Sequence, residues 1–366
     1  MSIKHLKDKD LAELVGNDVE SLEYNQKKFE LEQDSIRSRY DQMQERKEEL
    51  ALLDSFDLDN EDPSIIQKIA DETEEYLIKA KNAKVFLNDD FKGKVPLFPR
   101  NVILAAAETG VGKSTICANL AFQAILQGQR VLILTNEENP GDIYNRITCL
   151  IKDWSYINHS DFTEEQRKTF KEMTHALSER VVIVSDSRGK QNGLTTTLEG
   201  VQKVLNSVIE KDSKFDLIMI DYYQNINQST AIPGMVDWQV QYRFCKFIDQ
   251  YKNKSNAAIV ILAQLKSMKD KELSFQDAIE GRKTIMTIST CVLRVSRDVE
   301  HQRTGFEIMK SRFGESLGQT VYVGFRRGKY VDYTPAFKNE VEMNKLAKAT
   351  QAMTGKLKTS NFNSED

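Results

Sequence analysis

Ala107-Glu-Thr-Gly-Val-Gly-Lys-Ser114 follows the apolar run Val102–Ala107 and precedes a stretch of helical composition, Thr115–Ala124. A strand, a glycine-containing loop and the start of a helix, in this order, make up the phosphate-binding P-loop pattern. The backbone N–H groups of such a loop hold phosphate oxygens, and the helix dipole adds positive potential at the same place. Ala107 stands where the usual pattern has its first glycine. Because alanine is also small, we still predict a nucleoside triphosphate site.

The pattern assigns a task to each residue of the loop. Lys113 is expected to reach the β- and γ-phosphates of ATP, and the Ser114 hydroxyl is expected to bind Mg²⁺. The remaining residues expected to surround the nucleotide are Glu108, Thr109, Gly110, Val111, Gly112 and Thr115.

A second acidic motif, Phe215-Asp-Leu-Ile-Met-Ile-Asp221, is an apolar run that ends in an aspartate. Downstream of a P-loop, such a strand end is typical of the Walker B carboxylate, which holds the shell of the Mg²⁺ ion. Asp221 is therefore the second predicted metal residue.

The run Arg130-Val-Leu-Ile-Leu-Thr-Asn-Glu-Glu138 also ends in acids. A carboxylate at this place can polarise the water that attacks the γ-phosphate. Glu137 and Glu138 compete for that task, and Glu137 is preferred on spacing. In the alternative interpretation, both acids cap the helix that begins near Pro140.

Two further motifs have both a functional and a structural interpretation. Gln264 ends the run Ile259–Gln264 and either senses the γ-phosphate or is a hydrogen-bonded residue at a strand end. Lys310 and Arg312 point to the same face if they lie on a strand. They suit either a cluster of phosphate oxygens on a neighbouring subunit or a solvated strand end.

The loop after Gln264 contains the nucleic-acid candidates Gly281, Arg282 and Lys283. Gly281 would let the backbone approach a partner closely, and the two cations could hold phosphates. A charge run of this kind is also common in solvated loops.

Bulk composition excludes several classes of protein. The 366 residues carry a net charge of −4, so any contact with nucleic acid must come from a local basic surface. The four cysteines show no CxxC spacing and are expected to be reduced. Neither a signal peptide nor a membrane-spanning run is visible, so we expect a cytoplasmic protein.

Residues 1–95 have a different pattern from the rest of the chain. Apolar residues recur every seven positions at Val15, Leu22, Phe29, Ile36, Met43 and Leu50. This period predicts a long helix, which either folds back on its neighbour or associates with another copy or a partner. A second helix is expected from about residue 64 to 83, and a linker over 84–100.

From residue 100 onward, β-branched runs alternate with helical segments, which predicts a mainly parallel α/β sheet. The runs lie at 102–107, 131–135, 181–185, 216–221, 258–263 and 290–296. Segments 305–310 and 319–325 are expected to pair as strands. We therefore predict a helical N-terminal extension over 1–95, an ATPase domain over 96–335 and a flexible tail over 336–366.

Together these segments resemble the DnaB-like replicative helicases, a hexameric branch of the RecA-fold ATPases, over roughly residues 85–335. The resemblance rests on the phosphate loop, on Thr135-Asn-Glu-Glu138, on Ile220-Asp-Tyr-Tyr-Gln224 and on Lys310-Ser-Arg-Phe-Gly314. It implies that Glu137 is the catalytic glutamate and that Arg146 belongs to the nucleotide site. It also implies that Gln264 is the sensor and that Lys310 and Arg312 reach the γ-phosphate across a subunit boundary.

Two departures qualify this resemblance. The N-terminal part has a heptad instead of the family's globular collar, and Ile279-Glu-Gly-Arg282 stands where the family's DNA loop reads Arg-Glu-Ser-Gly. We expect an ATP- and Mg²⁺-dependent DNA helicase that forms a ring, with DNA and a primase or loader as partners. A RecA-type recombinase and a loader or regulator that does not unwind DNA are the alternatives.

Overall fold

The computed structural model describes residues 67, 68, 70, 71, 73–75, 78 and 84–366, except 157–160, 187–192, 212, 213, 233, 267–274, 280–283, 313–315 and 361–366. The predicted heptad and the candidates Gly281, Arg282 and Lys283 therefore lie outside the described residues. The described residues between 67 and 78 are helical, within the second predicted helix. The chain divides into two units, residues 1–74 and 75–366.

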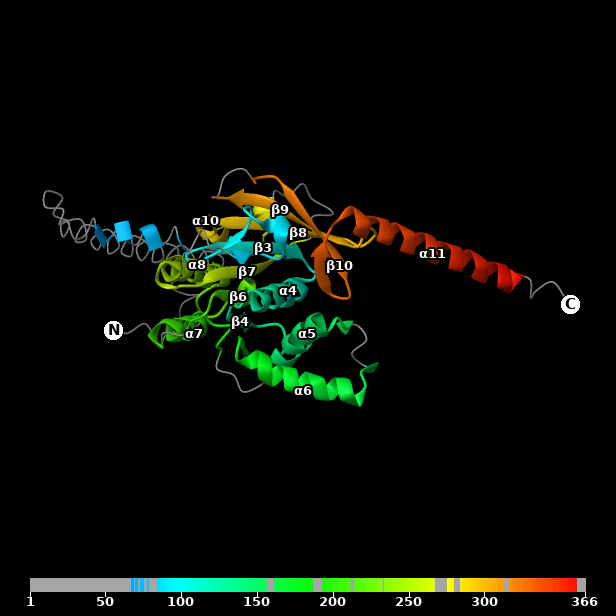
Figure 1. Ribbon diagram of the computed structural model, residues 1–366. Coiled ribbons are helices and arrows are strands. Elements are labelled where there is room, and N and C mark those ends of the chain that lie inside the picture. The colour runs from blue at the N-terminus through cyan, green and yellow to red at the C-terminus, as the bar shows by residue number, and fades with distance from the viewer. Residues whose placement is uncertain are drawn as a thin grey trace, which may run out of the picture. The chain divides into compact units, whose positions relative to one another are not determined.

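The second unit contains a nine-stranded sheet with the order β11-β10-β9-β8-β3-β7-β6-β4-β5 (Figure 1). The strands from β8 to β5 run parallel, which confirms the predicted mainly parallel α/β class. They are β3 (Val102–Glu108), β4 (Val131–Thr135), β5 (Val181–Ser185), β6 (Leu217–Asp221), β7 (Ala258–Leu265) and β8 (Cys291–Asp298). The antiparallel strands are β9 (Arg303–Ser311), β10 (Thr320–Arg326) and β11 (Lys329–Asp332).

Helices cover both faces of this sheet. Side chains along β3 alternate, so that Ile103 and Ala105 pack with α4 (Lys113–Leu126), while Val102 and Leu104 pack with α8 (Asp237–Lys254). The first face also carries α5 (Pro140–Lys152) and α6 (Glu164–Ser178), and the second carries α7 (Leu198–Glu210) and α10 (Thr284–Ile288). Burial on both faces explains why the parallel strands are continuous apolar runs.

Local sequence sets the starts of these helices. Pro140 occupies the first turn of α5, where its missing N–H costs nothing. Thr163 and Gln166 form a reciprocal capping box at the start of α6. α4 differs, because it starts after Gly112 without a side-chain cap. Its first N–H groups therefore face the loop that precedes it.

The predicted linker over 84–100 is wrong, because this segment packs into the core. It forms β1 (Lys84–Val85), the short helix η2 (Asp89–Phe91) and β2 (Pro96–Leu97), and β1 pairs with β2. Phe86 and Phe91 are fully buried, and the ring of Phe91 lies 5.3 Å from that of Phe306 in β9. The apolar residues of the segment have neither a helical nor a strand period, so periodicity does not reveal their burial.

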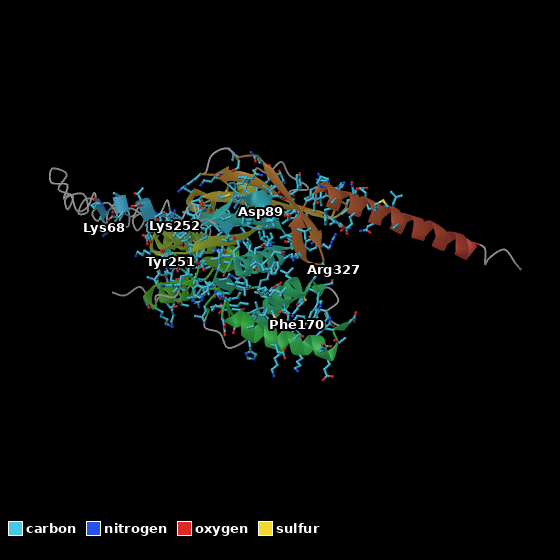
Figure 2. All side chains as sticks on the ribbon, in the orientation of Figure 1. Lys68, Asp89, Phe170, Tyr251, Lys252 and Arg327 are labelled. Atoms are coloured by element: carbon cyan, nitrogen blue, oxygen red, sulfur yellow. The ribbon has the colours of Figure 1, made fainter. Side chains whose placement is uncertain are left out.

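The C-terminal part contains two further elements. The short strand β11 has no counterpart among the predicted runs, and Pro335–Ser360 forms a helix, α11, over most of the predicted tail. Phe337 anchors its start against Gly324, where a Cβ atom would approach the Phe337 ring to 2.8 Å. At the β10–β11 turn, Arg327 forms an ion pair of 3.1 Å with Asp153 after α5 (Figure 2).

Candidate nucleotide site

The glycine loop lies at the carboxyl end of β3 and leads directly into α4. Gly110 and Gly112 have φ angles of 82° and 105°, which residues with a Cβ atom rarely adopt. A Cβ on Gly112 would also lie 3.3 Å from the Thr115 hydroxyl. Thr109 and Gly110 are exposed, whereas Glu108, Val111, Ser114 and Thr115 are half-buried. The loop is therefore open to solvent at the uncapped start of α4, a geometry that suits an anion.

Lys113 is nearly buried, with 7% of its surface exposed, and lies at the carboxyl edge of the sheet. Its Nζ lies 3.4 Å from the Oε1 atom of Gln264 at the end of β7 and 5.2 Å from the Tyr222 ring centroid. The Gln264 Nε2 atom donates to the Thr109 hydroxyl at 2.7 Å. The structure thus brings the loop lysine and the predicted sensor glutamine into contact.

Asp221 ends β6 with only 1% of its surface exposed. Burial and the nearby carboxylates of Glu137 and Glu138 raise its pKa to about 7, although Lys113 and Arg146 act in the opposite direction. Its Oδ1 atom is buried and has no hydrogen-bond partner among the described residues. A buried carboxylate oxygen without a donor, at the same edge of the sheet as Ser114, fits a Mg²⁺ ion that would supply the missing charge.

The two acids after β4 have different surroundings. The Thr135 hydroxyl accepts the backbone N–H groups of Glu137 and Glu138 at 3.3 and 3.2 Å. The Glu138 carboxylate forms an ion pair of 3.1 Å with Arg146 in α5, and the Arg146 guanidinium stacks 4.5 Å from the Tyr156 ring. Glu137 is exposed, and its carboxylate makes no hydrogen bond or ion pair with the described part of the chain. Glu137 is therefore the acid that is available to a water molecule or ligand.

Lys310 and Arg312 lie at the opposite edge of the sheet. Lys310 pairs with Val292, and the Arg312 N–H bonds to the Thr290 carbonyl, which puts Arg312 level with the start of β3. The start of β3, and with it Arg312, is six residues along the strand from Glu108 at the other end, a distance of about 20 Å. Neither cation can reach the phosphate loop of its own chain.

Backbone carbonyls hold both cations in place. The Lys310 Nζ atom donates to the carbonyls of Met286 and Thr287 at 2.7 and 3.0 Å, near the end of α10. An Arg312 Nη2 atom approaches the Thr287 carbonyl at 3.5 Å. Burial together with the charges of Arg312 and of Lys252 in α8 lowers the pKa of Lys310.

The loop with the nucleic-acid candidates starts after Gln264, next to the phosphate loop, although the three candidates themselves are not described. The Lys266 N–H donates to the carbonyl of Ala278 in α9 (Phe275–Ala278) at 2.8 Å, and Leu265 pairs with Ile279. The chain therefore returns to the end of β7 at Ile279, and the three candidates lie between Ile279 and Thr284 at the start of α10.

Two residues at the carboxyl edge of the sheet were not predicted from the sequence. Asn136, between Thr135 and Glu137, bonds to several backbone groups after β6. Arg297, near the end of β8, lies 4.1 Å over the Phe325 ring and close to Gly112. Asn136 lies within the motif Thr135-Asn-Glu-Glu138, whereas Arg297 lies in no motif. The contacts of both residues join segments far apart in the chain, so no local pattern could indicate their roles.

The described residues contain no group of three or more His, Cys, Asp or Glu side chains placed to hold a metal ion. None of their helices has the length and apolar character needed to cross a membrane.

Comparisons with known proteins agree with this geometry. The family model described as the DnaB-like helicase C terminal domain matches residues 90–318. One solved structure, of an ATPase domain, is similar with a TM-score of 0.59 and 15% identity, covering 74% of this chain and 99% of that chain. "The Structure Of A DnaB-Like Replicative Helicase And Its Interactions With Primase" is similar with a TM-score of 0.56 and 14% identity, covering 75% and 67%. No curated protein matches the chain significantly. The predicted RecA-like fold is confirmed.

Proposed function

Since the chain belongs to the DnaB-like helicase family, we propose that it is a replicative DNA helicase that hydrolyses ATP, moves along single-stranded DNA and separates the strands as a ring. One observation carries the proposal. Lys113, Asp221 and Glu137 meet at one edge of the sheet, whereas Lys310 and Arg312 lie at the other edge. A nucleotide site that uses all five residues needs two copies of the chain.

Each residue at the carboxyl edge has a task in this proposal. The loop amides and Lys113 would hold the phosphates, while Ser114 and Asp221 would hold the Mg²⁺ ion. A bound Mg²⁺ ion would neutralise charge that develops on the phosphate oxygens. Glu137 accepts a hydrogen bond from the attacking water and orients it, because its carboxylate is exposed and unengaged among the described residues. Gln264 contacts Lys113 and reports the presence of the γ-phosphate to the loop after β7.

Arg146 has a supporting task. Its ion pair holds Glu138 away from the water position and leaves Glu137 as the nearer base. This arrangement favours Glu137 in the choice between the two acids.

Lys310 and Arg312 complete the site of the neighbouring copy. Cations supplied across a subunit boundary stabilise the charge of the phosphoryl-transfer transition state, and such an arginine contributes about 10³–10⁵ in rate. The carbonyls that hold Lys310 leave its charge in a fixed position before the neighbour arrives.

We further propose that Gly281, Arg282 and Lys283 contact the DNA strand. Ile279, the described residue that precedes them, pairs with Leu265 next to Gln264, so hydrolysis at the nucleotide site can move the segment that carries them. A primase or a loader is proposed as a protein partner, since one structurally similar helicase is described with a primase.

The test combines a mass measurement with a fork assay. With an ATP analogue and single-stranded DNA, the particle should have the mass of a closed ring, with a hexamer as the expected size. With ATP, it should separate a forked duplex. Open filaments would point to a recombinase instead, and DNA-dependent ATP hydrolysis without unwinding would point to a loader or regulator. A single chain with full turnover and no response to DNA would rule out the proposal.

A further inference from the structure

Asn136 occupies a junction between the strands that carry the two key acids. β4 and β6 are adjacent and parallel, and their last registered pair is Thr135 with Asp221. Glu137 follows only two residues after Thr135, beyond the last rung of the ladder. Strand pairing therefore holds Asp221 but does not hold the backbone that carries Glu137.

The side-chain amide of Asn136 continues the ladder by one step. Its Nδ2 atom donates to the Tyr222 carbonyl at 3.0 Å, and its Oδ1 atom accepts the Tyr222 N–H at 3.3 Å. The Asn136 N–H donates to the Asp221 carbonyl at 3.0 Å. The amide thus pairs with both polar groups of one residue, as a peptide group does in a sheet.

A second set of bonds restrains the same amide from the other side. Asn136 Nδ2 also donates to the Thr195 carbonyl at 3.2 Å, and Oδ1 accepts from Asn225 in the short helix η5 (Tyr223–Asn225) at 3.1 Å. Both donors and both lone pairs of the amide are therefore used. A side chain with all its bonds satisfied in one geometry is held rigidly.

The Thr195 carbonyl is itself fixed. The carboxylate of Asp186, which follows β5, accepts the backbone N–H groups of Leu194, Thr195 and Thr196 at 2.8, 2.8 and 2.9 Å. These bonds lower the pKa of Asp186 against the effect of its partial burial. Asp186 therefore orients the carbonyl that Asn136 uses.

We propose that Asn136 is a positioning residue that fixes the Glu137 backbone relative to Asp221, and that Asp186 supports it through Thr195. This inference rests on the proposed function, because it assigns Glu137 to the water and Asp221 to the metal. Misplacement of a catalytic group by about 1 Å can cost about 10²-fold in rate. The phosphate loop makes none of these bonds among the described residues, so ATP binding should not depend on them.

The test uses the full chain, with ATPase activity measured in the presence of Mg²⁺ and single-stranded DNA. Asn136→Leu keeps the approximate volume and removes every side-chain bond. We expect kcat to fall by about 10²-fold, with KM for ATP and the ring mass unchanged. Asn136→Asp keeps the acceptor but replaces the donor with a second oxygen that faces the Thr195 and Tyr222 carbonyls, and it adds a negative charge beside Asp221. A fall in kcat at least as large as that of Asn136→Leu is therefore expected. Asp186→Asn should also lower kcat, but by less than Asn136→Leu does. Asn253→Leu makes the same chemical change on the exposed surface of α8 and should have no effect.

Two results would overturn the inference. One is an Asn136→Leu chain with unchanged kcat. The other is a parallel loss of kcat, ATP affinity and ring assembly in both Asn136 variants, which would make Asn136 a structural residue only. Failure of the proposed function looks different, because the unmodified chain would then show no DNA-dependent ATP hydrolysis.

Discussion

Asp221 occupies an electrostatically unfavourable position. Burial next to Glu137 and Glu138 raises its pKa from 3.8 to about 7. At a pH between these two pKa values, Asp221 keeps a proton in the folded chain that it has released in the unfolded chain. The free energy of unfolding therefore decreases as the pH rises from about 4 to about 7. A metal ion that binds the deprotonated carboxylate would offset this cost.

We therefore predict that Asp221→Asn flattens the pH dependence of stability in the presence of EDTA. Denaturant unfolding between about pH 4.5 and pH 8 should show a decreasing free energy of unfolding for the unmodified chain and a smaller decrease for the variant. Asp237→Asn, an exposed change at the start of α8, should keep the original slope. Identical slopes for the Asp221 variant and the unmodified chain would contradict the prediction.

Glu137 and Glu138 are adjacent in sequence but differ in their partners. Glu137→Gln should lower kcat by about 10²–10⁴-fold, the range for removal of a general base, while nucleotide binding persists. Glu138→Gln should cost less, because it breaks the ion pair with Arg146 without removing the base. Steady-state ATP hydrolysis with single-stranded DNA measures both. If Glu138→Gln proves the more severe change, the assignment of the base to Glu137 is wrong.

At the scale of the elements, local patterns predicted the strands closely. The β-branched runs at 131–135 and 181–185 coincide with β4 and β5, because parallel strands buried on both faces must be apolar along their length. The phosphate loop and the acids after β4 and β6 could be predicted for the same reason, since each is tied to a strand end. Asn136 could not, because its partner Tyr222 lies 86 residues away.

The burial of segment 84–100 could not be predicted from the sequence. Phe86 and Phe91 sit among Asp, Asn and Lys residues, and each is buried by contacts with β9 that depend on the tertiary fold. We predict that Phe91→Ala lowers the free energy of unfolding by about 3–5 kcal/mol, the range for truncation of a buried Phe. Tyr242→Ala, on the exposed side of α8, should cost far less in the same denaturant titration. Equal costs would show that this segment does not contribute to the core.

At the scale of the whole molecule, the arrangement of charges implies an assembly. The sequence placed Lys310 and Arg312 in a motif but could not give their distance from the phosphate loop, because that distance depends on the register of β8 and β9. Along the sheet, Arg312 lies about 20 Å and Lys310 about 13 Å from Glu108, which leaves a neighbouring copy as the acceptor of these cations. Because each nucleotide site then takes residues from two copies, every site depends on two chains.

This dependence predicts a specific result for mixed assemblies. Arg312→Ala should lower ATP hydrolysis by about 10³-fold or more when all copies carry it. When variant and unmodified chains are mixed before assembly, unwinding should fall more steeply than the fraction of variant chains, because one defective boundary interrupts hydrolysis around the ring. Arg167→Ala, on the exposed side of α6, serves as the control and should leave mixed rings fully active. A fall strictly proportional to the variant fraction would mean that each chain works alone, and the shared site would then have to be abandoned.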